Sequence, residues 1–174
     1  MIGKHISLRA PEPADAELLF KWENDTSIWQ VSNTIMPFSR FAIEQYVMNT
    51  QLDIYSTKQL RLMIDLHIKN KIVTIGTIDL FDFEPTHMRA GVGILIREEM
   101  SNKGYASEAM ELLIDFAFNT LQLHQLYCNI DAENKKSLHL FKKFNFKEVG
   151  LKKEWLSVKN RWVDEYLLQL INDK

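Results

Sequence analysis

Residues 90–96, AGVGILI, and residues 102–109, NKGYASEA, decide the fold of this chain. The first stretch reads as an apolar strand with two glycines, and the second as a polar turn in which a glycine and small residues open a helix. Such a turn directs backbone N–H groups without helical partners towards one point, which suits a phosphate group. The sequence therefore predicts that a phosphorylated cofactor binds at Gly104.

The helix that follows has an apolar face, with its members at Ala106, Ala109, Met110, Leu113, Ala117 and Leu121. The acids between them, Glu108 among them, are expected to face water. A glycine before a helix is common, so Gly104 alone does not indicate a site, but the full segment favours a ligand. A dinucleotide-binding turn is excluded because Ile96 stands where its third glycine belongs, and the chain has no P-loop string.

Residues 102–109 resemble the pyrophosphate-binding turn of the GNAT acetyltransferases, whose pattern is Q/R-x-x-G-x-G/A. Residues 134–137, NKKS, and 140–146, LFKKFNF, resemble the second conserved helix of that family. Residues 8–11, LRAP, and 160–164, NRWVD, resemble the branch of ribosomal-protein N-terminal acetyltransferases and spermidine or diamine N-acetyltransferases. The resemblance spans nearly the whole chain.

The resemblance implies one GNAT domain over residues 1–174 with an α+β fold. Its mostly antiparallel, mixed sheet would be flanked by helices, and two central strands, 89–96 and 125–131, would splay apart. The donor would be acetyl-CoA, with CoA as product and the pantetheine arm in the gap between these strands. The cofactor-binding residues so predicted are Ile94, Leu95, Ile96, Ser101, Asn102, Lys103, Gly104, Tyr105, Ala106, Ser107, Asn134, Ser137, Phe141 and Lys143.

Three residues depart from the family pattern. Ser101 stands where the first Gln or Arg would be, and Gly91 occupies the position of a glutamate that helps deprotonate the amine in many relatives. Phe141 replaces a tyrosine that often protonates the departing thiolate. The binding half of the motif is intact, whereas the usual acid–base half is not.

Acetyl transfer to an amine requires a proton acceptor, donors for the thioester oxygen and a proton for the thiolate. Strand N–H groups near Ile94 would hold the oxygen, as in relatives; Gly91 and Gly93 would permit a bulge that exposes them, or merely ease packing. Ser137 is the candidate acid, by resemblance to the ribosomal-protein branch, and the alternative is a helix-capping serine. His87, next to the site strand, is the candidate imidazole base, and a water chain that ends on Asp82, Glu84 or Glu154 is the alternative. The histidines lack metal-ligand spacing, so no metal site is expected.

Acids interleaved with tryptophans near both ends of the chain suit a cationic acceptor. The alternative is that these tryptophans belong to the core and the acids beside them are merely solvated. The predicted acceptor-binding residues are Trp22, Glu23, Trp29, Asp82, Glu84, Trp162 and Asp164. The favoured function is acetyl-CoA-dependent N-acetylation of a primary amine of the polyamine or diamine type. The alternatives are N-terminal acetylation of a ribosomal or other protein, and a catalytically idle CoA-binding module.

The composition is that of an ordinary globular protein, with 46% hydrophobic and 25% charged residues among 174. A net charge of −2 disfavours nucleic acid as a partner. One cysteine and an N-terminus without an apolar stretch predict a cytoplasmic protein, and no apolar run has the roughly 20 residues that span a membrane. A homodimer or higher homo-oligomer is expected by analogy with relatives.

Hydrophobic periodicity and turn residues divide the chain into alternating helices and strands. Helices are expected at 13–23, 39–51, 104–121 and 134–144. Strands are expected at 6–9, 60–68, 72–81, 89–96, 125–131, 146–155 and 162–171. Turns are predicted at Asn70-Lys71 and at Glu84-Pro85-Thr86.

Overall fold

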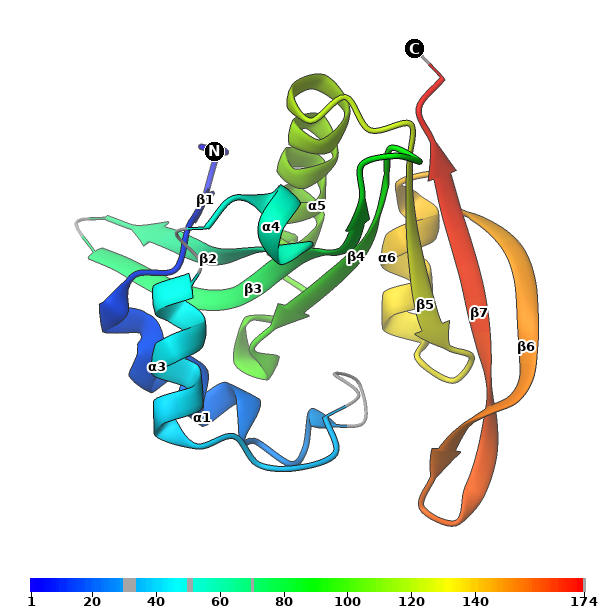
Figure 1. The fold of residues 1–174 in the computed structure, drawn as a ribbon, viewed down its shortest axis with the longest axis horizontal. Helices are drawn as coiled ribbons and strands as arrows, with labels where there is room; N and C mark the ends of the chain where they lie inside the picture. Colours follow the sequence, from blue (N-terminus) through cyan, green and yellow to red (C-terminus); the bar gives the residue numbers. More distant parts are fainter. Residues whose placement is uncertain (30–33, 50–51, 70, 174) are drawn as a thin grey trace.

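The computed structural model of the chain describes residues 1–29, 34–49, 52–69 and 71–173 (Figure 1). Seven strands form one sheet in the order β1-β2-β3-β4-β5-β7-β6. The strands are β1 (Ile6–Arg9), β2 (Leu60–Ile68), β3 (Lys71–Glu84), β4 (Arg89–Ile96), β5 (Gln125–Asp131), β6 (Lys147–Val158) and β7 (Arg161–Ile171). Among the strands of the described residues, the β4–β5 pair alone is parallel. The predicted α+β fold with a mixed, mostly antiparallel sheet is confirmed.

Helices cover the two faces of this sheet. They are α1 (Ala16–Glu23), α3 (Arg40–Asn49), α4 (Ile54–Thr57), α5 (Tyr105–Asp115) and α6 (Lys135–Lys143), with 3-10 turns η1 (Pro13–Asp15) and η2 (Glu98–Met100) and a π turn η3 (Phe116–Thr120). None of the helices within the described residues is long and apolar enough to cross a membrane.

The period-two alternation of β2 builds two separate cores. Leu62 and Ile64 belong to the larger core, in which the apolar faces of α5 and α6 cover the sheet. Met63 points to the other face, where it packs against α1 and α3 with Leu19 and Ile43. Helices α1, α3, α5 and α6 are therefore held by apolar burial, the dominant stabilising contribution in a fold of this kind.

The starts of the helices follow the capping signals of the sequence. The hydroxyl of Ser39 accepts a hydrogen bond from Ala42 N at 3.1 Å, so the predicted N-cap of α3 is confirmed. Gln51, the predicted end of that helix, and Asn70, in the predicted turn, lie outside the described residues. Glu108 does not face water as expected: it is half-buried, and its Oε1 accepts the N–H groups of His5 and Ile6, which ties α5 to the start of β1.

The strands β4 and β5 part after three residue pairs, of which Gly91 with Tyr127 is the last (Figure 1). Beyond this point β4 continues to Ile96, paired only with β3, while β5 continues to Asp131, paired only with β7. The predicted splay is confirmed. It leaves the backbone of residues 92–96 without a strand partner on the β5 side.

Irregularities lengthen some strands beyond their predicted bounds. β3 runs on to Glu84 because a bulge lies between Phe81 and Glu84, with Asp82 in the left-handed region at φ 47°. β6 has an irregularity between Lys152 and Leu156. Of the two alternatives for the glycines of β4, the bulge is absent, because β4 pairs with β3 in unbroken register from residue 91 to residue 96.

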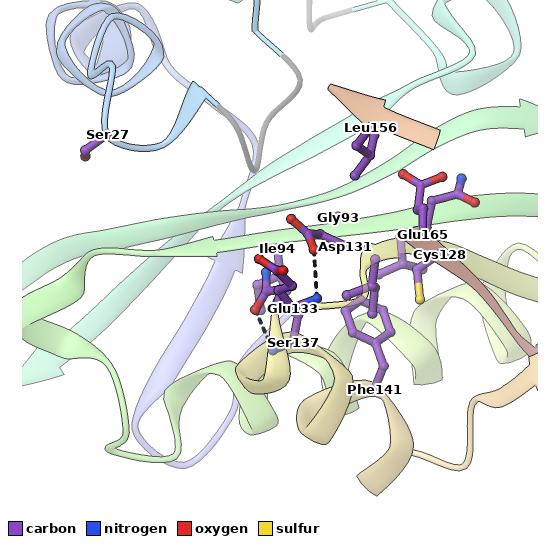
Figure 2. Close-up of a pocket in the computed structure, with 14 residues that line it drawn as sticks. Ser27, Gly93, Ile94, Cys128, Asp131, Glu133, Ser137, Phe141, Leu156 and Glu165 are labelled. Atoms are coloured by element: carbon purple, nitrogen blue, oxygen red, sulfur yellow. Dashed lines mark hydrogen bonds between the residues drawn. The ribbon is translucent and has the colours of Figure 1, made fainter. Parts of the chain in front are cut away.

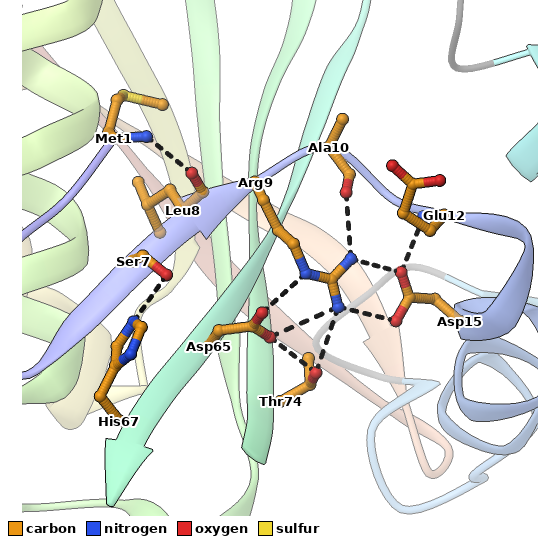
Figure 3. A network of polar contacts seen from close by, with 10 residues as sticks. All are labelled: Met1, Ser7, Leu8, Arg9, Ala10, Glu12, Asp15, Asp65, His67 and Thr74. Carbon is orange, nitrogen blue, oxygen red and sulfur yellow. Dashed lines mark hydrogen bonds and ion pairs between the residues drawn. The ribbon is translucent and has the colours of Figure 1, made fainter. Parts of the chain in front are cut away.

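Arg9, which belongs to the stretch 8–11 noted in the sequence, is the centre of a network of ion pairs with two buried carboxylates (Figure 3). Its guanidinium donates two hydrogen bonds to Asp15, at 2.6 and 2.9 Å, and two to Asp65, at 2.6 and 3.5 Å. Both carboxylates are buried. Burial alone would raise the pKa of Asp15, but hydrogen bonds from Arg9 and from Glu12 N outweigh this and hold the pKa below its usual 3.8.

Arg9→Met is expected to lower the free energy of unfolding at neutral pH by about 3 kcal/mol, because it leaves two buried carboxylates without a cationic partner. The matched control Arg40→Met breaks an exposed pair with Glu17 and should cost no more than about 1 kcal/mol. Denaturant unfolding of both variants measures the difference. The lowered pKa of Asp15 stabilises the fold above pH 3.8, and this contribution is lost as the pH falls through the folded-state value. The deficit of Arg9→Met should therefore shrink in acid; a deficit independent of pH would contradict the network's role.

Candidate active site

The gap between β4 and β5 holds a cavity of about 370 Å³ (Figure 2). Val92, Gly93 and Ile94 of β4 form one wall, and residues 128–131 of β5 form the opposite wall. Ser137 and Phe141 of α6 close the cavity from one end. The splay thus creates an internal space rather than a mere break in the sheet.

A second cavity, of about 340 Å³, lies between the end of β4 and the N-termini of α5 and α6. Gly104 is the N-cap residue of α5 at φ 88°, and no side chain caps this helix. A Cβ at Gly104 would have no atom within 4 Å, so this backbone faces open space. The first N–H groups of a helix have no intrahelical acceptor, so those of α5 are available to an anion here.

Twelve of the fourteen residues predicted to bind the cofactor line this second cavity, namely Ile94, Leu95, Ile96, Ser101, Asn102, Gly104, Tyr105, Ala106, Ser107, Asn134, Ser137 and Lys143. The exceptions are Lys103, whose Nζ turns back to Glu99 O at 2.8 Å, and Phe141, which is buried and lines the first cavity. Lys143 spans the space, donating to Ser107 Oγ at 3.0 Å. Lys136 and His139 also line the cavity and were missed, although Lys136 stands within the motif that was noticed. The positive charges of Lys136 and Lys143 suit phosphate groups.

Ser137 lies where the first two cavities meet, since both share Ile94, Asn134 and Ser137. The N-cap of α6 is Asn134, whose Oδ1 accepts from Ser137 N at 3.1 Å. The structure therefore assigns the capping role to Asn134 and not to the Ser137 side chain. Among the described residues no hydrogen bond is made by Ser137 Oγ, which leaves the hydroxyl able to donate to a bound group.

A third cavity, of about 660 Å³, adjoins the first at Val92, Gly93 and Ile94. It carries an excess of negative charge, because four carboxylates face two cationic side chains. These are Glu23, Asp79, Asp82 and Glu165, and Arg61 and Lys152. Such a cavity suits a cationic molecule.

A buried ion network forms one wall of this third cavity. Arg61 donates to Asp79 Oδ1 at 2.7 Å and to Glu23 Oε1 at 2.5 Å. Burial raises the pKa of Asp79, against the opposing effect of Arg61. Arg61 and Asp79 are direct cross-strand partners, a register that local sequence patterns do not reveal. Both residues were missed for this reason.

The structure places only part of the predicted acceptor set in the third cavity. Glu23 and Asp82 line it. Trp22 packs against the α1–α3 core, and Trp29 donates to Glu23 O at 2.9 Å. Trp162 is 63% exposed, and Glu84 accepts from Thr86 N at the end of β3. The Asp164 carboxylate accepts hydrogen bonds from Lys153 Nζ and from Glu154 N, both in the irregular part of β6, so its hydrogen bonds are made within the β6–β7 hairpin.

The imidazole predicted as a base lies apart from these cavities. His87 is exposed in the turn between β3 and β4, and this turn lies at the end of the sheet where β4 and β5 are still paired. It lines none of the three cavities. The geometry gives His87 no access to an amine held at Gly93.

Packing accounts for the glycine at position 91. A Cβ there would lie 2.4 Å from Phe81 Cε2, so the ring fills the space that any side chain at position 91 would need. At Gly93 a Cβ would meet Phe81 at 3.7 Å and Asp79 Oδ2 at 3.9 Å, which is ordinary contact. Close packing by Phe81 at Gly91, rather than a bulge, is what the structure supports.

Gly91→Glu is expected to destabilise the protein by about 2 kcal/mol or more, because the added side chain overpacks against Phe81. Gly93→Ala, with ordinary contacts, should cost clearly less. Combining Gly91→Glu with Phe81→Gly should recover part of the loss, since the two sites are in contact. Thermal unfolding of the wild type, the two single variants and the double variant tests this. A Gly91→Glu variant as stable as the wild type would refute the packing account.

The fold and the three adjoining cavities form the arrangement expected of a group-transfer enzyme, which must hold a donor beside an acceptor. A family model described as an acetyltransferase (GNAT) domain matches residues 5–147. The chain is 25% identical to a spermidine N(1)-acetyltransferase of Vibrio cholerae, over 99% of this chain and 96% of the relative. It is 27% identical to a putative ribosomal N-acetyltransferase of Bacillus subtilis, over 90% of this chain and 86% of that one.

Solved structures agree on the fold. The crystal structure of a Vibrio cholerae spermidine N-acetyltransferase in complex with CoA and spermine superimposes with a TM-score of 0.86, covering 97% of this chain and 96% of that one at 23% identity. The chain therefore belongs to the GNAT acetyltransferase family. It is an N-acetyltransferase, and the donor used by the family is acetyl-CoA. The second cavity fits that donor, since it combines open helix N–H groups with lysine side chains.

Proposed function

We propose that the protein acetylates a primary amine of a small polyamine or diamine, with acetyl-CoA as donor. The observation that carries this proposal is the acidic third cavity, which adjoins the gap in the sheet at Gly93 and Ile94. A polyamine carries several positive charges, and the excess of carboxylates in this cavity would attract it. The spermidine acetyltransferases among the relatives support the same class of acceptor.

The residues around the gap would serve the thioester oxygen and the departing thiolate, while the proton lost by the amine would pass to solvent water. The backbone of β4 between residues 92 and 96 lacks a strand partner on the β5 side, so its N–H groups can stabilise an oxyanion. Ser137 would supply the proton that the departing thiolate takes up. Proximity of amine and thioester in adjoining cavities would provide much of the rate.

Release of free thiol from acetyl-CoA in the presence of a panel of amines tests the proposal. The panel holds polyamines, aminoglycosides, amino acids and N-terminal peptides of ribosomal proteins. We expect polyamines to give the highest kcat/KM. Preference for a peptide would favour the protein acceptor instead, and CoA binding without turnover of any amine would favour an idle binding module.

Asp82→Asn provides a variant test of the acceptor site, since Asp82 forms no ion pair with a described residue and lines the third cavity. It should raise the KM for a polyamine several-fold with little effect on CoA affinity. Glu111→Gln removes a carboxylate from the exposed face of α5 and serves as the control. Equal KM values for both variants would count against a role of Asp82 in acceptor binding.

A homo-oligomer is the assembly that we propose. A Vibrio cholerae spermidine N-acetyltransferase, 25% identical with a TM-score of 0.79 over 97% of this chain and 95% of that one, is a dodecamer. Large apolar side chains are exposed in the segment before and within α3, among them Ile35, Met36 and Phe41. Sedimentation of the pure protein measures the assembly, and a monomer at micromolar concentration would contradict it.

A further inference from the structure

One cationic side chain of the protein lies inside the acidic third cavity without being part of the Arg61 network. Lys152 projects from β6, and its Nζ forms an ion pair with Glu165 and a hydrogen bond to Asn129 Oδ1 at 3.0 Å. The same Nζ lies 4.8 Å from the centroid of the Trp155 ring. Lys152 is therefore enclosed by a carboxylate, an amide oxygen and an aromatic face.

These three partners, Glu165, Asn129 and Trp155, are called the ammonium box below. A carboxylate and an amide oxygen accept hydrogen bonds from an ammonium group, and an aromatic face attracts its charge. Glu165 is buried, at 5% exposure, so a cation that pairs with it is strongly favoured over none. All three residues line the third cavity, and Glu165 and Asn129 also line the first, at the gap in the sheet.

We propose that the ammonium box is a binding subsite for a cationic group of the acceptor, and that Lys152 occupies it as a tethered competitor until the acceptor displaces it. This inference rests on the proposed function, because it identifies where that acceptor's charge binds. An acceptor with at least two cationic groups would place one in the box while another amine reaches Gly93. Acceptors that bear a carboxylate would meet Glu165 and be disfavoured.

The two cations of the cavity differ in how they are held, and the difference makes Lys152 displaceable. Arg61 is fixed by a fork of hydrogen bonds to two carboxylates, and its side chain is 17% exposed. Lys152 has one carboxylate partner, is 30% exposed and stands on a flexible stem of four carbons at the edge strand of the sheet. Its ammonium can therefore move into solvent without breaking the strand pairing of β6.

Two substitutions of Lys152 should shift the acceptor KM in opposite directions. Lys152→Met removes the competitor, so the KM for spermidine should fall about fivefold to tenfold with kcat changed little. Lys152→Arg keeps Glu165 paired and binds it through two hydrogen bonds, so the KM should rise. A merely structural lysine would predict a different pattern of KM: Lys152→Arg like the wild type, and Lys152→Met with an unchanged or higher KM.

Lys153→Met is the matched control, because the neighbouring Lys153 pairs with Asp164 away from the cavity. It should leave the spermidine KM unchanged. Adding Trp155→Leu to Lys152→Met should raise the KM again, since the aromatic wall is lost from a box without its competitor. The Trp155 side chain is 59% exposed, so this change should not compromise folding.

Failure of the inference is separable from failure of the proposed function. Wild-type turnover with the amine panel decides the function. Calorimetric titration of spermidine into the wild type and into Lys152→Met then measures whether the ammonium box binds a cationic group, even if spermidine is not acetylated. Tighter spermidine binding by Lys152→Met, with unchanged CoA affinity, supports the inference; equal or weaker binding by a folded Lys152→Met variant overturns it.

Discussion

Gly104→Val should weaken the binding of CoA at least a hundredfold. Gly104 is at φ 88°, in the left-handed region that a β-branched residue rarely adopts, and its missing side chain faces the open second cavity. Valine would both strain the start of α5 and fill the space in front of its free N–H groups. Calorimetric titration with CoA measures the loss.

Two further substitutions separate occlusion of the cavity from backbone strain. Gly104→Asn tolerates the left-handed backbone yet still places a side chain in the cavity, so it should fold normally and bind CoA poorly. Gly150→Val adds a side chain at a glycine that also has open space around it, in β6, and should leave CoA affinity unchanged. Undiminished CoA binding by folded Gly104→Val and Gly104→Asn would refute the placement of the diphosphate.

Ser137→Ala should lower kcat about a hundredfold while CoA affinity changes less than threefold. The substitution removes the hydroxyl at the junction of the first two cavities. The N-cap of α6 survives, because Asn134 Oδ1 binds the backbone N–H of residue 137. Steady-state kinetics with acetyl-CoA and the best amine of the panel measure the effect.

Ser157→Ala is the control for this substitution, since Ser157 is an exposed serine of β6 that lines none of the three cavities. Its kcat should equal that of the wild type. A Ser137→Ala variant that retains wild-type kcat would remove Ser137 from the mechanism and leave the thiolate to be protonated by solvent.

Local signals in the sequence were sufficient for most of the fold. The strands at 60–68, 89–96 and 125–131 have the predicted bounds, because apolar runs bounded by turn residues specify them locally. The helix after Gly104 was also foreseen, but its last turn is the π turn η3 from Phe116 to Thr120, which periodicity does not distinguish from an α-helix. The short helix α4, with Asp53 as its N-cap, was not predicted.

The cofactor side of the site could be predicted because its residues come from two contiguous motifs. The acceptor side could be predicted only in part, at Glu23 and Asp82, since the rest of its wall is assembled by cross-strand register. Arg61 lies beside Asp79, and Lys152 beside Glu165, only because β2 pairs with β3 and β6 pairs with β7 in a particular alignment. Asp164, one residue from Glu165, was among the predicted acceptor-binding residues, but its carboxylate accepts from Glu154 N in the irregular strand β6.

A crystal structure of the protein with bound CoA tests the central claim most directly, namely that the gap between β4 and β5 is the place of acetyl transfer. The account predicts the diphosphate on the N–H groups that follow Gly104 and the sulfur in the first cavity, between Gly93 and Ser137. Density for CoA elsewhere on the molecule, with no part of CoA in the gap between β4 and β5, would contradict it.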